Sequence, residues 1–121
     1  MKDIEVGEYV RTKEGEIHKV IKIIEDDGDW DYYCCGNNVG YFAMDIANHS
    51  KQLIDLIEVG DIVNSCIVVG FGYECVNGNK EKSILVEGKY TKVNFALLNW
   101  DIKTILTKES YMANCYKVGR G

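Results

Sequence analysis

Two segments of the chain are nearly identical, "IEVGEYV" at residues 4–10 and "IEVGDIV" at residues 57–63. The same offset of 53 residues places Phe42 on Phe95, and one deletion then brings Lys51 onto Lys103. Matches at both ends of a unit of about 50 residues indicate an internal duplication. We therefore predict two tandem units, residues 1–56 and 57–121, which either stand apart or pack as one body.

The repeated segment is expected to be structural rather than functional. Each copy has a glycine after its first valine, Gly7 and Gly60, and glycine adopts the positive φ of a bend without strain. Strand alternation then predicts that the valines on both sides of the bend point to a core. These valines are Val6, Val10, Val59 and Val63.

Short apolar blocks rich in β-branched and aromatic residues indicate a mostly β protein. No block sustains a helical period over 12 residues. The expected strands are EYVRT (8–12), EIHKVIKII (16–24), DWDYYCC (29–35), GYFAMDI (40–46), KQLIDLI (51–57), DIVNSCIVVGFGY (61–73), KSILVEGKY (82–90), KVNFALL (92–98), IKTILT (102–107) and CYKV (115–118).

Turn residues predict three hairpins and one helix. The hairpin turns are KEGE (13–16), DDGD (26–29) and VNGN (76–79), each with a glycine suited to positive φ. The only predicted helix is TKESYMAN (107–114), a short element near the C-terminus in which Thr107 can cap the first turn.

The opening of the first unit, "VGEYVRTKEGEIHKVIKI", resembles the start of a KOW-type motif in its spacing of Gly7, Val10, Gly15 and Val20. The resemblance implies that both units are small SH3-like barrels. SH3-like domains that bind RNA or ribosomal partners are usually basic, whereas this chain has a net charge of −5.

The phrases "VGEYVRTKEGEIHKVI", "HSKQLIDLIEVGDIV" and "DIKTILTKESY" resemble small phage and prophage proteins of AT-rich Gram-positive bacteria. The resemblance implies expression in the cytoplasm of a bacterial host. It also implies a non-catalytic inhibitor of host defence of the anti-CRISPR type. The implied partner is a host protein with a basic surface, such as a nucleic-acid-binding defence effector.

Negative charge is concentrated in the first unit and its junction with the second. Residues 25–61 carry a net charge of −8, against 0 for residues 1–24 and +3 for residues 62–121. The densest stretch is "EDDGDWD", where carboxylates flank aromatic side chains and can imitate nucleic-acid phosphates. The candidate partner-binding residues are Glu25, Asp26, Asp27, Asp29, Trp30, Asp31 and Tyr32.

The acidic stretch has two other interpretations. It can be a solvated hairpin tip that keeps the protein soluble and protects a sheet edge. It can also be a calcium-binding loop. A twelve-residue calcium loop has a bidentate glutamate at its last position, but the twelfth residue counted from Asp26 or Asp27 is Asn37 or Asn38.

A second candidate surface lies in the second unit, where aromatic and lysine side chains alternate. Stacking combined with positive charge would suit a small signalling nucleotide, and the protein would then act as a sponge. The simpler interpretation is an exposed, lysine-rich strand face. The residues are Phe71, Tyr73, Lys80, Lys82, Lys89, Tyr90 and Lys92.

A third possibility is a structural phage component, in which the acidic unit of one copy meets the basic unit of another and forms a homo-oligomer.

The sequence predicts neither an enzyme nor a metal or cofactor site. The five cysteines lack Cys-x-x-Cys spacing, and His18 and His49 stand far apart. Cys34 and Cys35 are adjacent, so a strand turns them to opposite faces. Because no apolar run approaches the roughly 18 residues of a membrane span, we expect a cytoplasmic protein without membrane contact. Because the chain is acidic, we expect no direct nucleic-acid binding.

Overall fold

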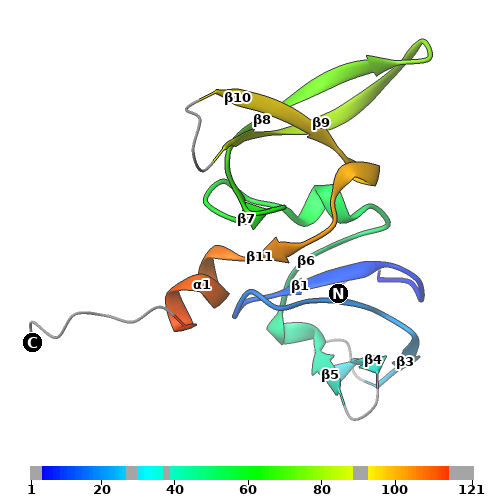
Figure 1. Cartoon of the computed structure of the whole chain (residues 1–121). Coiled ribbons are helices and arrows are strands. Elements are labelled where there is room, and N and C mark those ends of the chain that lie inside the picture. Colours follow the sequence, from blue (N-terminus) through cyan, green and yellow to red (C-terminus); the bar gives the residue numbers. More distant parts are fainter. Residues whose placement is uncertain (1–3, 27–29, 37–38, 89–92, 115–121) are drawn as a thin grey trace, which may run out of the picture.

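The computed structural model describes residues 4–26, 30–36, 39–88 and 93–114 (Figure 1). These residues form eleven strands, three 3-10 helices and one short α-helix near the end of the sequence. The predicted mostly β class and the short C-terminal helix are therefore confirmed. In the described part, no helix has the length and apolar character that crossing a membrane requires.

The elements follow one another as β1 (Tyr9–Thr12), β2 (Ile17–Lys19), β3 (Lys22–Ile24), β4 (Tyr32–Gly36), β5 (Val39–Phe42), η2 (Ala43–Asp45), β6 (Ile46–Ser50), η3 (Leu53–Leu56), β7 (Ile62–Val63), β8 (Cys66–Val76), β9 (Asn79–Glu87), β10 (Asn94–Leu98), η4 (Asn99–Asp101), β11 (Ile105–Leu106) and α1 (Lys108–Asn114).

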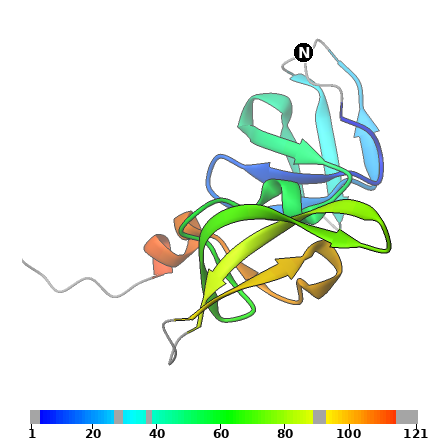
Figure 2. The same cartoon turned by 90° about the horizontal axis from the view of Figure 1, so that it is seen from above.

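The strands form three sheets, with the orders β2-β1-β6, β3-β4-β5 and β10-β9-β8-β7-β11. Pairing among the described strands leaves all three sheets open and closes no barrel. The five-stranded sheet contains the long β8–β9 hairpin, and its last strand, β11, is the one nearest the sheet of β1 (Figure 1). Figure 2 shows the same arrangement from above, with the β8–β9 hairpin nearest the viewer and most of the first half beside it.

The pairing pattern recurs in the two halves of the chain. In the first half, β1 pairs with β2 and β6; in the second half, β7 pairs in the same way with β8 and β11. All four pairings are antiparallel. β4 pairs with β3 and β5 as β9 pairs with β8 and β10. A 3-10 helix follows β5 in one half and β10 in the other. The single long strand β8 thus occupies the place that β2 and β3 share.

Hydrogen bonds of the repeated segment recur as well. In the first copy the Gly7 N–H donates to the Val20 carbonyl (2.8 Å) and the Glu8 N–H to the Glu5 carbonyl (3.1 Å). The Glu8 carboxylate accepts from the Glu5 N–H at 2.6 Å. The second copy makes the same three contacts with Gly60, Val68, Asp61 and Glu58.

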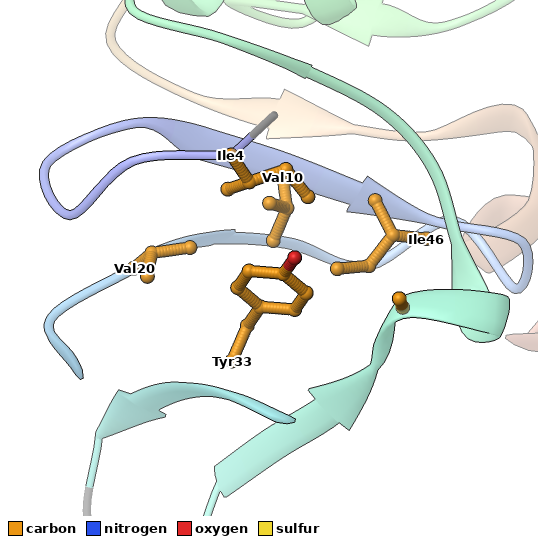
Figure 3. Packing of buried hydrophobic residues seen from close by; sticks show 6 residues of the cluster. Ile4, Val10, Val20, Tyr33 and Ile46 are labelled. Carbon is orange, nitrogen blue, oxygen red and sulfur yellow. The ribbon is translucent and has the colours of Figure 1, made fainter. Parts of the chain in front are cut away.

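Buried apolar side chains form two clusters, one in each half of the chain. In the first cluster, Ile4, Val10, Val20 and Ile46 surround the Tyr33 ring (Figure 3). Full burial of such a side chain contributes about 1.5–3 kcal/mol, so each cluster stabilises its own sheets. The second cluster comprises Ile54, Ile57, Val63, Val68, Ile84 and Val86.

The prediction that Val6 and Val59 point to the core is wrong, because 59% and 51% of their surfaces are exposed. The chain turns at the glycine that follows each of them, with φ of +97° at Gly7. Alternation therefore does not continue through the bend. Val10 and Val63, beyond it, are buried as predicted.

Several predicted strands are broken or replaced. KQLIDLI is not a strand, because its centre forms the 3-10 helix η3. The Ser50 hydroxyl donates to Asp55 (2.7 Å) and accepts from the Gln52 N–H (3.1 Å), which curls the chain. GYFAMDI is interrupted by η2, and EIHKVIKII divides after β2. The predicted CYKV strand lies outside the described residues.

EIHKVIKII divides because two successive N–H groups pair with different sheets. The Val20 N–H donates to Glu8 and the Ile21 N–H to Cys34, both at 2.8 Å.

The turn and cap predictions agree with the structure where it describes them. Gly15, Asn77 and Gly78 have φ of +89°, +50° and +80°. β3 and β4 form the expected antiparallel pair, although Asp27 to Asp29 of its turn lie outside the described residues. The Thr107 hydroxyl accepts from the Ser110 N–H (3.2 Å), so it caps α1.

Candidate functional site

The acidic candidate surface lies on the small sheet β3-β4-β5. One face of this sheet carries Tyr33 into the first core cluster. The opposite face carries a cross-strand row, in which Ile24 pairs with Tyr32 and Tyr32 pairs with Phe42. Because strand side chains alternate, this row points to solvent.

Aromatic side chains gather on that solvent-facing side. The Phe42 ring meets Tyr32 edge-on at 5.0 Å between centroids and Trp30 edge-on at 5.7 Å. The Tyr32 ring also lies over Gly40, where a side chain would collide with it. Trp30 remains 54% exposed and Ile24 48%. We call Ile24, Trp30, Tyr32 and Phe42 the aromatic face.

Carboxylates border the aromatic face. Glu25 and Asp26 directly follow Ile24 and are exposed. The Asp31 carboxylate accepts a hydrogen bond from the Asp26 N–H at 2.8 Å, so Asp31 also holds the two strand ends together. Asp27 and Asp29 lie outside the described residues.

The structure thus brings Glu25, Asp26, Trp30, Asp31 and Tyr32 together, and it adds Ile24 and Phe42, which sequence analysis missed. Phe42 could have been found from the cross-strand register, in which it lies opposite Tyr32. That register follows only once the position of the turn between β4 and β5 is known.

The second candidate surface is in part assembled on the β8–β9 hairpin. The Lys80 ammonium lies 4.6 Å from the centre of the Tyr73 ring, and the Lys82 ammonium lies 5.2 Å from that of Phe71. Lys82 also approaches Asp55 at 3.4 Å. Each of these two lysines thus lies over one aromatic ring of the hairpin. The other three predicted residues, Lys89, Tyr90 and Lys92, lie outside the described residues.

A buried ionic cluster centres on Arg11, which is only 1% exposed. Its guanidinium makes two contacts with the Asp61 carboxylate (2.5 and 2.9 Å) and one with Glu109 (2.6 Å). It also donates to the Leu56 carbonyl (2.9 Å) and lies 3.5 Å from Glu58. The cluster joins β1 to the turn before β7 and to α1. Sequence analysis missed it, although an arginine within a strand of a lysine-rich chain is a usable signal.

The electrostatics of the cluster favour its charged forms. Burial alone would raise the pKa of Asp61, but hydrogen bonds from Arg11 and from the N–H groups of Glu58 and Lys108 outweigh it and lower that pKa. Burial alone would lower the pKa of Arg11, but its hydrogen bonds to Asp61 and Glu109 outweigh burial and raise that pKa. A fully hydrogen-bonded pair tolerates burial, whereas either charge alone would not.

The lowered pKa of Asp61 makes stability dependent on acid. The carboxyl binds its proton more readily in the unfolded chain, so its contribution is complete above the ordinary value of 3.8 and is lost as the pH falls below it. We expect Asp61→Asn to be less stable at neutral pH and to lose less stability between pH 4 and 2. Urea unfolding of both proteins across that range measures this, and parallel pH curves would contradict it.

Two smaller polar contacts involve the histidines. His49 lies in β6, and its Nδ1 is 2.8 Å from Glu8. Burial raises the pKa of Glu8, yet the contacts with His49 and the Glu5 N–H outweigh it and lower that pKa. His18 is half-buried, and its Nε2 lies 3.0 Å from the Tyr41 hydroxyl.

Within the described ranges, no three His, Cys, Asp or Glu side chains are grouped so as to hold a metal ion. Cys34, Cys35, Cys66 and Cys75 are free thiols. Burial, together with the neighbouring Cys34, raises the pKa of Cys35, which makes its thiol a weak nucleophile.

Comparison with known proteins finds no matching family model, no matching curated protein and no matching solved structure.

Proposed function

We propose that the protein is a non-catalytic binding protein that occupies a basic, nucleic-acid-binding surface of another protein. The aromatic face supplies the contact area, and Glu25, Asp26, Asp27, Asp29 and Asp31 supply charge in place of phosphates. The resemblance to phage and prophage proteins provides the setting, in which the partner is a host defence effector and the protein is an anti-CRISPR-like inhibitor.

The observation that carries the proposal is the exposed aromatic cluster with carboxylates at its border. Trp30, Tyr32 and Phe42 gather on one solvent-facing sheet surface, and contiguous exposed apolar patches often mark interaction sites. Large, rigid aromatic side chains are enriched in the energetically dominant centres of interfaces. A charged border increases the association rate with a surface of opposite charge and selects that surface over others.

We further propose that the fold arose by duplication of an SH3-like unit, with units at residues 1–56 and 57–121. The recurring strand pairing and the recurring hydrogen bonds of the repeated segment support this. The contact between Arg11 and Asp61 then joins the two units into one body. The aromatic face and the carboxylates at its border, together the acidic aromatic surface, belong to the first unit. The long hairpin of the second unit carries lysines instead.

The two tryptophans provide a matched test of the aromatic face. Both are 54% exposed, but Trp30 belongs to that face and Trp100 lies in η4. With the wild-type chain as bait in a lysate of a phage-infected or lysogenic host, the partner is first identified by mass spectrometry. We expect Trp30→Ala to weaken its binding about 30-fold or more, the effect of losing an interface centre, and Trp100→Ala to leave it nearly unchanged.

Equal binding by the two tryptophan variants would contradict the proposal.

A second test addresses charge. The double variant Glu25→Lys with Asp26→Lys changes two exposed side chains without touching the cores. Binding to a basic surface should fall in this variant and should also fall as salt screens the charges.

The nucleotide sponge remains the second candidate, favoured by the pairing of Lys80 with Tyr73 and of Lys82 with Phe71 on one hairpin. The same capture distinguishes the two candidates. A sponge would retain a nucleotide rather than a protein, and its binding would survive Trp30→Ala.

A further inference from the structure

A groove runs between β2 and β11, and none of the residues that line it belongs to the aromatic face. It consists of two adjoining cavities of about 250 and 290 Å³, which share Ile17, His18 and Ile105. One cavity extends past Gly15 and Thr107, and the other past Lys19 and Lys103. The wall formed by β11 and its flanking residues therefore runs antiparallel to β2.

The β2 wall presents unpaired backbone groups. β2 is the last strand of its sheet and pairs only with β1 among the described strands. The Thr12 N–H donates to Glu16 and the Val20 N–H to Glu8, both at 2.8 Å. Hydrogen-bonded and non-hydrogen-bonded pairs alternate along an antiparallel ladder. The backbone groups of residues 17 and 19 therefore point away from β1.

The β11 wall also presents unpaired backbone groups. β11 is the last strand of the five-stranded sheet, and Ile105 pairs with Val63. The Asn64 N–H donates to the Thr104 carbonyl at 3.0 Å, so Asn64 and Thr104 form a hydrogen-bonded pair. Because the two kinds of pair alternate, the neighbouring pair of Val63 and Ile105 is not hydrogen-bonded. The N–H and C=O groups of Ile105 therefore point away from β7.

The side chains of the groove define what would fill it. Apolar groups come from Ile17, Ile102 and Ile105 on the two walls. At one end stand Lys19 and Lys103, and neither has a carboxylate within salt-bridge distance among the described residues. The other end carries Glu16, whose carboxylate accepts from the Tyr41 hydroxyl at 2.6 Å.

We propose that this groove binds an extended peptide segment of a partner protein by strand addition. The peptide runs antiparallel to β2, the longer free edge, and its backbone pairs with residues 17 and 19 on one side and with Ile105 on the other. Apolar side chains at alternate positions meet the isoleucines. An acidic residue at its N-terminal end meets Lys19 and Lys103. Main-chain pairing provides affinity in such complexes, and the flanking side chains provide specificity.

The test uses the whole chain and the synthetic peptide Asp-Val-Thr-Val-Thr-Val-Lys, with acetylated and amidated ends. The reversed peptide, Lys-Val-Thr-Val-Thr-Val-Asp, has the same composition and is the control. Fluorescence anisotropy measures binding, and NMR-detected amide exchange locates it. We expect the first peptide to bind at least tenfold more tightly and to slow exchange at Ile17, Lys19 and Ile105. Exchange at His18, whose N–H already pairs with β1, should not change.

Two lysine variants test the acidic end. Lys19 and Lys80 each lie over a tyrosine ring, at 5.7 and 4.6 Å from its centre, but only Lys19 borders the groove. Lys19→Glu should weaken the peptide about tenfold, and Lys80→Glu should leave it unchanged.

Equal affinity of the two peptides, or no change in exchange at Ile17 and Ile105, would overturn the proposal. So would occupation of the groove by a second copy of the chain, seen by sedimentation as a dimer that excludes the peptide. Because the aromatic face is not part of the groove, Trp30→Ala should not affect this peptide, and either proposal can fail alone.

Discussion

Replacing Arg11 with methionine should lower the free energy of unfolding by about 3–5 kcal/mol, the usual cost of breaking a buried ion pair on one side. Asp61 is fully buried and would lose both contacts with its countercharge. Glu109 would lose its contact as well, so α1 would be held less firmly. Urea unfolding followed by circular dichroism measures the loss.

The double variant Arg11→Met with Asp61→Leu separates the ionic effect from a general failure to fold. It removes both charges, and apolar replacement of a whole buried pair is often neutral or stabilising. We expect it to recover at least half of the loss. An Arg11→Met variant within about 1 kcal/mol of the wild type would show that the cluster does not join the two halves.

Gly15→Ala is the second change with a large expected effect. Gly15 has a φ of +89°, and a side chain there would collide with Thr107 and Glu109 at the start of α1. Its carbonyl also accepts from the Thr107 hydroxyl at 2.5 Å. Backbone strain and collision together should cost about 2–4 kcal/mol, since strain alone accounts for about 1–2 kcal/mol.

Gly78→Ala is the matched control, because Gly78 has a similar φ of +80° and no atom lies near the site of an added side chain. The difference between the two variants isolates the packing of α1 on the β1–β2 turn. Chemical denaturation of both proteins gives that difference. Equal losses would mean that α1 does not pack where the structure places it.

The parts of the fold that follow from local chemistry were predictable. Asn77 and Gly78 specify a tight hairpin, and Thr107 caps α1, because these features depend on residues next to one another. The exposed positions of Val6 and Val59 were not predictable from alternation, since alternation does not extend through the bend. The 3-10 helix η3 depends on the side chain of Ser50, which overrides an apolar pattern typical of a strand.

The candidate site was predictable in composition but not in extent. The run of carboxylates around Trp30 is visible in the sequence, whereas Phe42 joins the aromatic face only through the register of β4 and β5. Arg11 and Asp61 are 50 residues apart, and no local rule brings them together. The groove lies between β2 and β11, two edge strands of different sheets. Their proximity depends on how the sheets pack, which no local sequence pattern predicts.

The most direct test of the central claim is amide hydrogen exchange on the complex between the whole chain and its captured partner. We expect slower exchange in β3, β4 and β5, including Ile24 and Phe42, and no change in the β8–β9 hairpin. Protection confined to that hairpin, or spread over neither surface, would contradict the proposal that the acidic aromatic surface binds the partner.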